Sequence, residues 1–462
     1  MELNINQVLQ QAVAAHKEGK LEEAERLYRV VLQAQPTNVA THNNLGNILM
    51  ELRRLDEAEV SYKKAIDLKP DSIESYYNLG VTLQRLGKLD EAEASYKKAI
   101  EFKPDFIEAH SNLGVTLQRL GKLDKAAASF KKTIELKPDY ANSYCNLGVI
   151  LQQLGKFDEA ETSYKKAIEL KPNFTEAHYN LGNTLKMLDR LEDAEASYKK
   201  VIELKPDYAE AYSKLGNILV TFSKLDEAEV RYKKAIELKP DYAEAKHLLA
   251  ALTGETTNSP PREYVEKLFD GYASKFEHSL IDKLEYNIPK IITEMIVVKN
   301  PDVSLGSILD LGCGTGLIGV EIKKFCTNIE GIDLSNSMLE QARNKNIYNK
   351  LEHRDIVEYL STEDLDFNYF ISTDVFIYVG DLSDVFRLIK SRNKSRGKIA
   401  FSTEHTDKDG FVLEKSGRYS HSKKYIESLC EKFDYKLSYF KKTNLRKIKG
   451  KFIIGGLYLI DF

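Results

Sequence analysis

Apolar residues in the first half of the chain recur at helical spacing, in two segments per unit, and the unit returns every 34 residues. A glycine occurs at one place and a proline at another in successive units: Gly46, Gly80, Gly114, Gly148, Gly182 and Gly216, with Pro36, Pro70, Pro104, Pro138, Pro172, Pro206 and Pro240. A small residue lets two helices approach closely, and proline cannot continue a helix. Since one unit cannot bury its own apolar stripe, the pattern predicts helical hairpins stacked into an α-solenoid.

The period and these residues resemble the tetratricopeptide repeat (TPR) family over about residues 7–244. The resemblance implies a superhelix whose concave face binds a protein or peptide partner. One asparagine recurs in the first helix of five units, similar to the asparagine ladder in the TPRs of O-linked glycosyltransferases: Asn44, Asn78, Asn112, Asn146 and Asn180. An amide donates and accepts, so these side chains could hold a peptide backbone or could bond only neighbouring repeats. The repeated tyrosines of the second helices indicate packing between helices instead.

A polar segment at 253–261 ends in two prolines and interrupts helix and repeat together, so we place a linker there. It would separate a TPR array over 1–252, made of about seven 34-residue repeats and a C-terminal capping helix, from a second domain over 262–462. Helices are expected near 261–270 and 281–298, followed by short apolar runs that alternate with helical ones. The runs predict strands at 307–310, 328–332, 369–372 and 398–401, then an antiparallel pair at 435–439 and 452–459. This alternation favours a doubly wound α/β sheet.

A glycine-rich turn follows the first of these strands, with glycines at 312, 314 and 316. A dinucleotide-binding fingerprint needs its third glycine at position 317, which is Leu317, and no Lys-Ser/Thr pair follows as in a P-loop. Asp333 ends the next strand, where a carboxylate can accept hydrogen bonds from both hydroxyls of a ribose. The turn therefore indicates a nucleoside-containing cofactor other than a dinucleotide.

Together the turn and Asp333 resemble class I S-adenosylmethionine (SAM)-dependent methyltransferases, which have a seven-stranded Rossmann-like sheet. The resemblance covers about 262–462, and blocks at 269–276, 373–382 and 417–422 narrow it to bacterial TPR-containing methyltransferases. It implies a SAM site formed by Asp310, Gly312, Cys313, Gly314, Gly316, Asp333, Leu334, Met338, Asp355 and Ile356. Asp310 would lie near the methionine end, Leu334 and Met338 against adenine, and Asp355 at the adenine amino group. Met338 as plain helix core and Asp355 as a helix cap remain open alternatives.

Candidate catalytic residues follow the fourth and fifth predicted strands, because ligands of such sheets bind beyond the carboxyl ends of the strands. These residues are Asp374, Tyr378, Glu404 and His405. Four more residues are candidates for contacting the substrate or closing over it, three of them in an expected loop: Tyr272, Arg418, Tyr419 and His421. Glu404 or His405 could act as a base and Arg418 could hold an acidic substrate. For each of these residues, ordinary packing within a helix or loop is the alternative.

Composition excludes several other classes of protein. Lys+Arg 67 against Asp+Glu 70 gives a net charge of -3, which argues against a nucleic-acid partner. The four cysteines lack zinc spacing, so no metal is expected, and their small number fits a reducing compartment. The N-terminus lacks a secretory pattern, and no apolar run is long enough to span a membrane, so we expect a cytoplasmic protein.

The sequence thus predicts a SAM-dependent methyltransferase whose repeat array binds a protein partner or client. The methyl acceptor would be a small organic acid, a sugar or a protein side chain, and the residues do not decide among them. The alternative is a non-catalytic TPR scaffold whose second domain binds SAM as a sensor.

Overall fold

The computed structural model describes residues 4–271, 273, 276–277, 280, 284–298, 304–448 and 450–462. The chain divides into two compact units, Met1–Pro206 and Asp207–Phe462. The last repeats belong to the same unit as the sheet, so the division falls before the segment 253–261. The placement of a linker at 253–261 stays a prediction.

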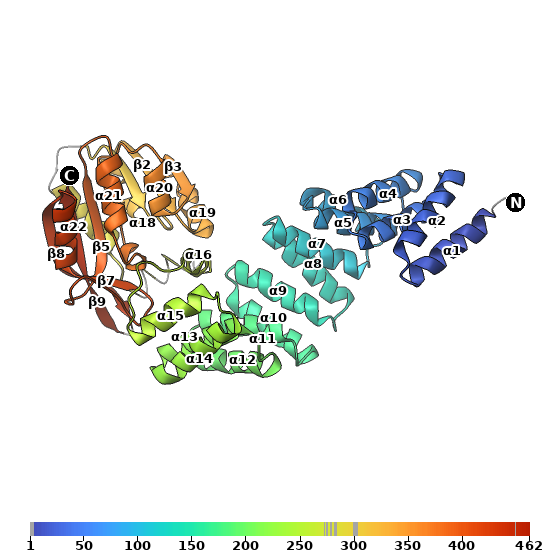
Figure 1. Cartoon of the computed structure of the whole chain (residues 1–462), viewed down its shortest axis with the longest axis horizontal. Coiled ribbons are helices and arrows are strands. Elements are labelled where there is room, and N and C mark those ends of the chain that lie inside the picture. The colour runs from blue at the N-terminus through green and yellow to red at the C-terminus, as the bar shows by residue number, and fades with distance from the viewer. Residues whose placement is uncertain are drawn as a thin grey trace. The chain divides into compact units, whose positions relative to one another are not determined.

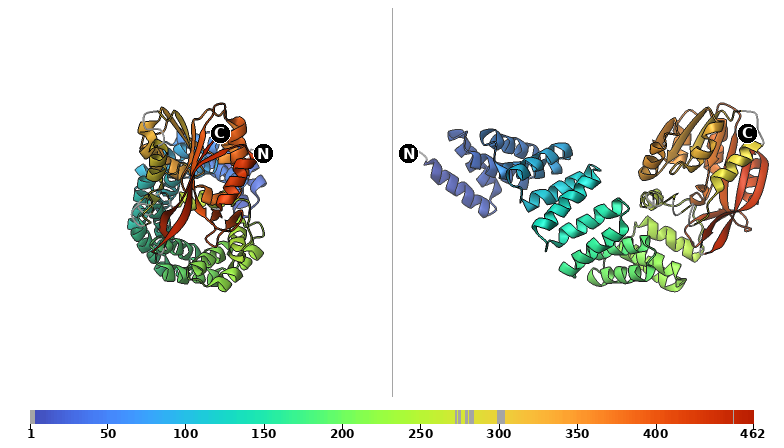
Figure 2. Two further views of the ribbon diagram at one scale, coloured as in Figure 1. Left: turned by 90° about the vertical axis from the view of Figure 1, so that its left-hand side faces the viewer. Right: turned by 180° about the vertical axis from the view of Figure 1, so that it is seen from behind.

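The first unit consists of helices arranged as successive antiparallel pairs (Figures 1 and 2). They are α1 (Ile5–Lys17), α2 (Leu21–Ala34), α3 (Val39–Glu51), α4 (Leu55–Leu68), α5 (Ile73–Arg85), α6 (Leu89–Phe102), α7 (Ile107–Arg119), α8 (Leu123–Leu136), α9 (Ala141–Gln153), α10 (Phe157–Leu170), α11 (Thr175–Met187) and α12 (Leu191–Leu204). The repeat glycines face the aromatic rings: a Cβ placed on Gly148 would lie 2.6 Å from the ring of Tyr164. Since these rings are fully buried, the tyrosines do pack between helices, as the sequence predicts.

Buried glutamates connect one repeat to the next. Glu93 on α6 is 7% exposed and binds Lys97 of its own helix and Lys122 of the next repeat, at 2.6 and 2.8 Å. The pair Glu161–Arg190 repeats this arrangement at 2.7 Å. These buried glutamates therefore tie neighbouring repeats together, each binding the cation that precedes the second helix of the next repeat.

The second unit begins with repeat helices and continues into the sheet domain (Figure 1). Its helices are α13 (Ala209–Thr221), α14 (Leu225–Leu238), α15 (Ala243–Thr253), α16 (Arg262–Asp270), α17 (Ile288–Val298), α18 (Leu317–Ile322), α19 (Asn336–Asn344), α20 (Ile356–Thr362), α21 (Ser383–Arg392) and α22 (Lys423–Lys432). Its strands are β1 (Ser307–Leu311), β2 (Asn328–Asp333), β3 (Lys350–His353), β4 (Tyr369–Ser372), β5 (Lys398–His405), β6 (Phe411–Leu413), β7 (Tyr419–His421), β8 (Lys436–Ile448) and β9 (Lys451–Asp461). Every strand predicted above is present, and the final two pair antiparallel.

Strand β5 is the centre of a mixed sheet. Strands β3, β2, β1, β4 and β5 run parallel in that order, β9 pairs antiparallel with β5, and β8 pairs with β9. These are the seven strands that the resemblance implies. The hairpin β6–β7 adds two more that the sequence analysis did not predict. Because β9 occupies one edge of β5 over Lys398–Glu404, β4 and β7 must share the other edge, β7 lying beyond the end of β4.

Alternate residues of each strand enter two different cores, one on each face of the sheet. Leu309 and Leu311 pack with α20, α21 and α22, whereas Ile308 packs with α17 and α18. This alternation follows from the period of two in a strand, and it covers both faces with helices. The doubly wound α/β architecture predicted from the sequence is confirmed. Within the residues that the structure describes, none of the helices combines the length and apolar character that crossing a membrane demands.

Candidate functional site

The glycine turn after β1 adopts a backbone that only glycine takes without strain. Gly312, Gly314 and Gly316 have φ of 76°, 54° and 87°. A Cβ on Gly312 would lie 2.6 Å from Val375, so the neighbouring strand end also leaves no room for a side chain there. The main chain of the turn can therefore approach a ligand closely.

Asp333 connects this turn to the end of β2. Its carboxylate accepts hydrogen bonds from the N–H of Gly314 and of Ser335, each at 2.8 Å. Burial raises its pKa, and the two N–H donors act against that rise. A carboxylate has about four lone-pair sites, so two acceptor positions remain for ribose hydroxyls.

Asp310, at the end of β1, carries an unsatisfied buried oxygen. Its side chain is 0% exposed, Tyr348 donates to Oδ2 at 2.6 Å, and Oδ1 has no partner among the described residues. Burial raises the pKa of Asp310 to about 7. A buried acceptor left unpaired costs roughly 1–3 kcal/mol, and a cationic donor such as an ammonium group would remove that cost. The residues thus fit the methionine end of SAM.

The remaining predicted cofactor residues also surround the ends of β1–β3. Met338 is 1% exposed in α19, and Leu334 is half-buried. Asp355 caps α20, its Oδ1 accepting from the N–H of Val357 at 2.8 Å. The structure therefore shows the capping role that was one of two alternatives. Cofactor contacts of the other predicted residues, Cys313 and Ile356 included, stay predictions.

The predicted catalytic residues Asp374 and Glu404 meet through Arg446, which the sequence analysis missed. Arg446 lies in β8, its side chain is 4% exposed, and it forms ion pairs with both carboxylates. Arg418 donates from Nε to Glu404 Oε1 at 2.8 Å. Two guanidinium groups and two carboxylates therefore form one buried network at the carboxyl ends of β4 and β5.

Asp374, whose side chain is 12% exposed, is the member of this network that follows β4. It has φ of 62°, a value that costs energy for a residue other than glycine and clusters at functional sites. Its N–H donates to Ser402 Oγ at 2.9 Å, while Oδ1 is buried without a partner in the part of the chain that is described. Tyr378 lies near the network, and burial raises the pKa of its phenol.

His405 does not join this network. Consecutive residues of a strand point to opposite faces, so His405 points away from its neighbour Glu404. Its Nε2 lies 3.1 Å from Asp407 Oδ1, and its ring lies against Phe440. Among the described residues, no hydrogen bond or ion pair joins the His405 side chain to Asp374, Tyr378 or Glu404.

Tyr419 and His421 lie in strand β7, where a loop was expected, and both are 0% exposed. His421 Nε2 bonds to the carbonyl of Gly380 at 2.8 Å, and burial lowers its pKa to about 4. Tyr419 bonds through its hydroxyl to Thr257 at 2.7 Å. Strand pairing to β5 holds them in place, so these two side chains are packed and cannot swing over a ligand as a loop would. Tyr272, the fourth candidate of this group, lies outside the described residues.

Two phenylalanines that the sequence analysis did not single out lie over the glycine turn. The ring of Phe276 would be 4.0 Å from a Cβ on Gly314. Phe269 at the end of α16 packs edge-on against both Phe276 and Tyr378, at ring-centroid distances of 6.2 and 5.1 Å. These rings form an apolar cover between the turn and the end of β4.

The five asparagines at the repeated position are half-buried. Two of them donate side-chain hydrogen bonds to the preceding repeat. Asn78 donates from Nδ2 to Asn47 Oδ1, and Asn112 donates to the hydroxyl of Tyr77, both at 3.1 Å. Asn78 and Asn112 therefore make the bonds between neighbouring repeats that were one of the two alternatives. Peptide binding by Asn44, Asn146 and Asn180 and by these two stays a prediction.

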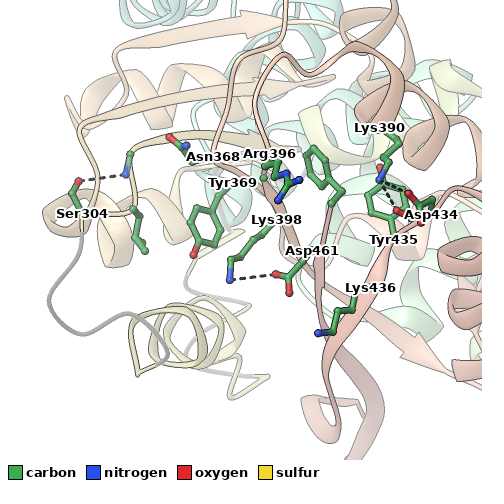
Figure 3. A pocket seen from close by; sticks show the side chains of 14 residues that line it. Ser304, Asn368, Tyr369, Lys390, Arg396, Lys398, Asp434, Tyr435, Lys436 and Asp461 are labelled. Carbon is green, nitrogen blue, oxygen red and sulfur yellow. Dashed lines mark hydrogen bonds and ion pairs between the residues drawn. The ribbon is translucent and has the colours of Figure 1, made fainter.

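A hollow of about 730 Å³ lies at the other end of the strands from the candidate site, beside the amino ends of β4 and β5 (Figure 3). Its lining includes four basic residues, and two of these have acidic partners: Lys398 lies 3.2 Å from Asp461, and Lys390 lies 3.5 Å from Asp434. None of the predicted site residues lines it. This hollow is thus separate from the candidate site.

Comparisons with known proteins agree with this two-part organisation. Residues 5–252, more than half of the chain, match the family described as the C-terminal domain of cilia and flagella-associated protein 70. Residues 302–451 match a family described as a methyltransferase domain. Among solved structures, the chain is 31% identical to MamA over 35% of this chain and 94% of that one, with a TM-score of 0.34. It is 26% identical to YrrB, described as a TPR protein with an unusual peptide-binding site, over 40% and 96% of the chains, with a TM-score of 0.36.

Two curated relatives are methyltransferases. An uncharacterized methyltransferase of Schizosaccharomyces pombe is 25% identical over 166 residues, 31% of this chain and 57% of that protein. Malonyl-[acyl-carrier protein] O-methyltransferase of Bacillus cereus is 26% identical over 144 residues, 30% and 52% of the two chains. The chain spans little more than half the length of these relatives, and one is from a yeast, so the narrower bacterial resemblance stays a prediction. The chain belongs to the family of the cilia and flagella-associated protein 70 C-terminal domain through its helical repeats, and it carries a methyltransferase domain after them.

Proposed function

We propose that the chain is a SAM-dependent methyltransferase that binds the cofactor at the ends of β1 and β2. The observation that carries this proposal is the buried Oδ1 of Asp310, an acceptor next to the glycine turn that has no partner among the residues described by the structure. SAM contains an ammonium group and two ribose hydroxyls, which match the open acceptors of Asp310 and Asp333. When bound, SAM supplies an electrophilic methyl group, so the protein needs no nucleophile of its own.

The chain's own residues would then orient the reactants and exclude water. The turn from Gly312 to Gly316 brings main chain to the cofactor, while Phe269 and Phe276 cover it with apolar rings. Exclusion of water strengthens the polar contacts inside such a site. Alignment alone supplies much of the rate in a displacement reaction of this type.

The acceptor would bind beside the network of Asp374, Glu404, Arg418 and Arg446. A carboxylate acceptor needs no base, whereas a hydroxyl or an amine must lose a proton, which Asp374 Oδ1 would accept. Arg418 is the cation of the network with the most exposed side chain, 21%, and could bind an anionic acceptor. The name of the Bacillus cereus relative states methylation of an oxygen, which supports an oxygen acceptor here. Small organic acids, sugars and protein side chains all meet these conditions.

Calorimetric titration with SAM tests the cofactor site. Asp333→Ala removes the ribose acceptors and should weaken binding by about 2–4 kcal/mol, the value of two charge-assisted hydrogen bonds. Asp364→Ala, at a side chain that is 88% exposed, is the matched control and should bind normally. Equal affinity in the two variants would refute the site assignment.

Transfer itself is tested with methyl-labelled SAM, the purified protein and a cell lysate separated into macromolecules and small molecules. Label in either fraction that depends on the protein supports the methyltransferase. Intact SAM binding without any transferred label would instead support the non-catalytic scaffold.

A further inference from the structure

The last repeat helix, α15, packs directly on the hairpin β6–β7 of the sheet domain. Ala250 and Ala251 of α15 share one buried cluster with Leu413 and Tyr419 of the hairpin. His247, 4% exposed, bonds through Nε2 to the carbonyl of Gly417 at 3.0 Å, and its ring lies 6.1 Å from that of Tyr419. This contact joins residues 170 positions apart in the chain.

The segment that follows α15 continues the same contact. The hydroxyl of Thr257 lies 2.7 Å from that of Tyr419, and Asp381 donates its N–H to the carbonyl of Asn258 at 2.9 Å. The fit leaves no spare room, since a Cβ on Gly380 would lie 2.6 Å from Asn258 O. Part of the segment predicted to be a linker is therefore hydrogen-bonded to the sheet domain.

The hairpin presents two sides with different contacts. Tyr419 faces α15, and Arg418, one residue earlier, points to the other side because side chains alternate along an extended chain. There Arg418 bonds to Glu404, which is paired with Arg446 and through it with Asp374. A displacement of Tyr419 would thus displace Arg418 as well.

We propose that α15 and residues 256–258 form part of the acceptor site, with His247 and Thr257 as positioning residues that place Arg418 against Glu404. The inference rests on the proposed function in one respect, that the network of Asp374, Glu404, Arg418 and Arg446 faces the methyl acceptor. Helix α15 would then support the acceptor site in addition to ending the helical array. Helix α15 and the methyltransferase domain would then share one rigid contact at the site.

The test uses the full-length protein with two variants that each remove one hydrogen bond and keep the volume. His247→Phe keeps the ring beside Tyr264 and Tyr419, and Thr257→Val removes only a hydroxyl. His247→Gln can still donate to Gly417 and serves as the conservative rescue. His178→Phe and Thr162→Val are controls, since these side chains bond only to carbonyls within the first unit.

Hydrogen exchange of residues 411–421, followed by mass spectrometry, is the first readout. Loss of one buried hydrogen bond should accelerate exchange of the hairpin roughly tenfold in His247→Phe and in Thr257→Val, with recovery in His247→Gln. Unchanged exchange of the hairpin in the two variants combined would overturn the inference.

SAM affinity and transfer of label are the second readout. We expect unchanged SAM affinity, because Asp310 and Asp333 are not touched, and a raised KM for the labelled acceptor at nearly constant kcat. Loss of SAM affinity in His247→Phe would contradict a role confined to the acceptor side. Failure of the wild-type protein to bind SAM would refute the proposed function and leave the exchange result standing on its own.

Discussion

Replacing Arg446 by methionine is the most informative single change to the candidate site. Arg446 binds Asp374 and Glu404 from β8 and is almost completely buried. Methionine has a similar length and no charge, so the variant keeps most of the packing and removes both ion pairs. Glu404 keeps Arg418 as a partner, whereas Asp374 loses the one ion pair that it makes with described residues.

The expected loss of stability is large, because the variant leaves the Asp374 carboxylate buried without its cation. Removing one partner of a buried ion pair costs about 3–5 kcal/mol. Replacing a buried ion pair or triad by neutral groups of similar shape is often close to neutral. The triple variant Asp374→Asn, Glu404→Gln, Arg446→Met should therefore recover most of what the single variant loses.

The assay must report on the sheet domain alone, since the chain has two units and need not unfold in one step. Hydrogen exchange of β5, β8 and β9 gives the free energy of opening for that part. A loss of about 3–5 kcal/mol corresponds to exchange faster by roughly two to four orders of magnitude in Arg446→Met. Exchange within about tenfold of wild type, or a triple variant as unstable as the single one, would refute the reasoning.

Three further predictions concern other parts of the chain. Gly148→Ala should destabilise the first unit by about 1–3 kcal/mol, because its Cβ would overlap the buried ring of Tyr164, and a double variant with Tyr164→Leu should recover part of the loss in urea unfolding. His421 has a pKa lowered to about 4, so its contribution to stability is complete above the usual histidine pKa of about 6.5 and is lost as the pH falls toward 4. The full loss of folding free energy between pH 6.5 and 4 is about 3 kcal/mol. His421→Gln should therefore flatten the pH dependence of hydrogen exchange in the sheet domain between these pH values. An unchanged slope in this variant would contradict the assignment to His421. Asn112→Ala combined with Asn146→Ala should weaken capture of a peptide partner by the repeats at least about tenfold if their amides hold its backbone, whereas equal capture would leave them with the bonds between repeats alone.

The repeats and the central strands could be predicted because their causes are local in sequence. The contact of Gly148 with Tyr164 recurs at a fixed spacing, and each central strand is a short apolar run. The cofactor residues could be predicted for the same reason, since Asp310 lies near the end of one such strand and Asp333 is the last residue of the next. The placement of a functional residue at a strand end needs no knowledge of distant contacts.

Arg446 and the hairpin β6–β7 could not be predicted in this way. Arg446 lies in a Lys/Arg-rich stretch that is typical of a solvated surface, and its two partners are 42 and 72 residues away in sequence. Strands β6 and β7 have 3 residues each, too few to show a period. A buried charge is recognised only when its partners are known, and those come from the tertiary fold.

The hairpin also explains why the predicted lid residues split into two groups. Residues at odd and even positions of an extended chain face opposite sides, so adjacent positions serve different neighbours. Arg418 therefore hydrogen-bonds to Glu404, while Tyr419 packs against α15 and hydrogen-bonds to Thr257. A sequence block such as 417–422 can thus combine a residue of the acceptor site with residues that fasten the domain to the last repeat. For this reason, substitutions at Tyr419 are expected to affect the acceptor through Arg418, without any contact between Tyr419 and the acceptor.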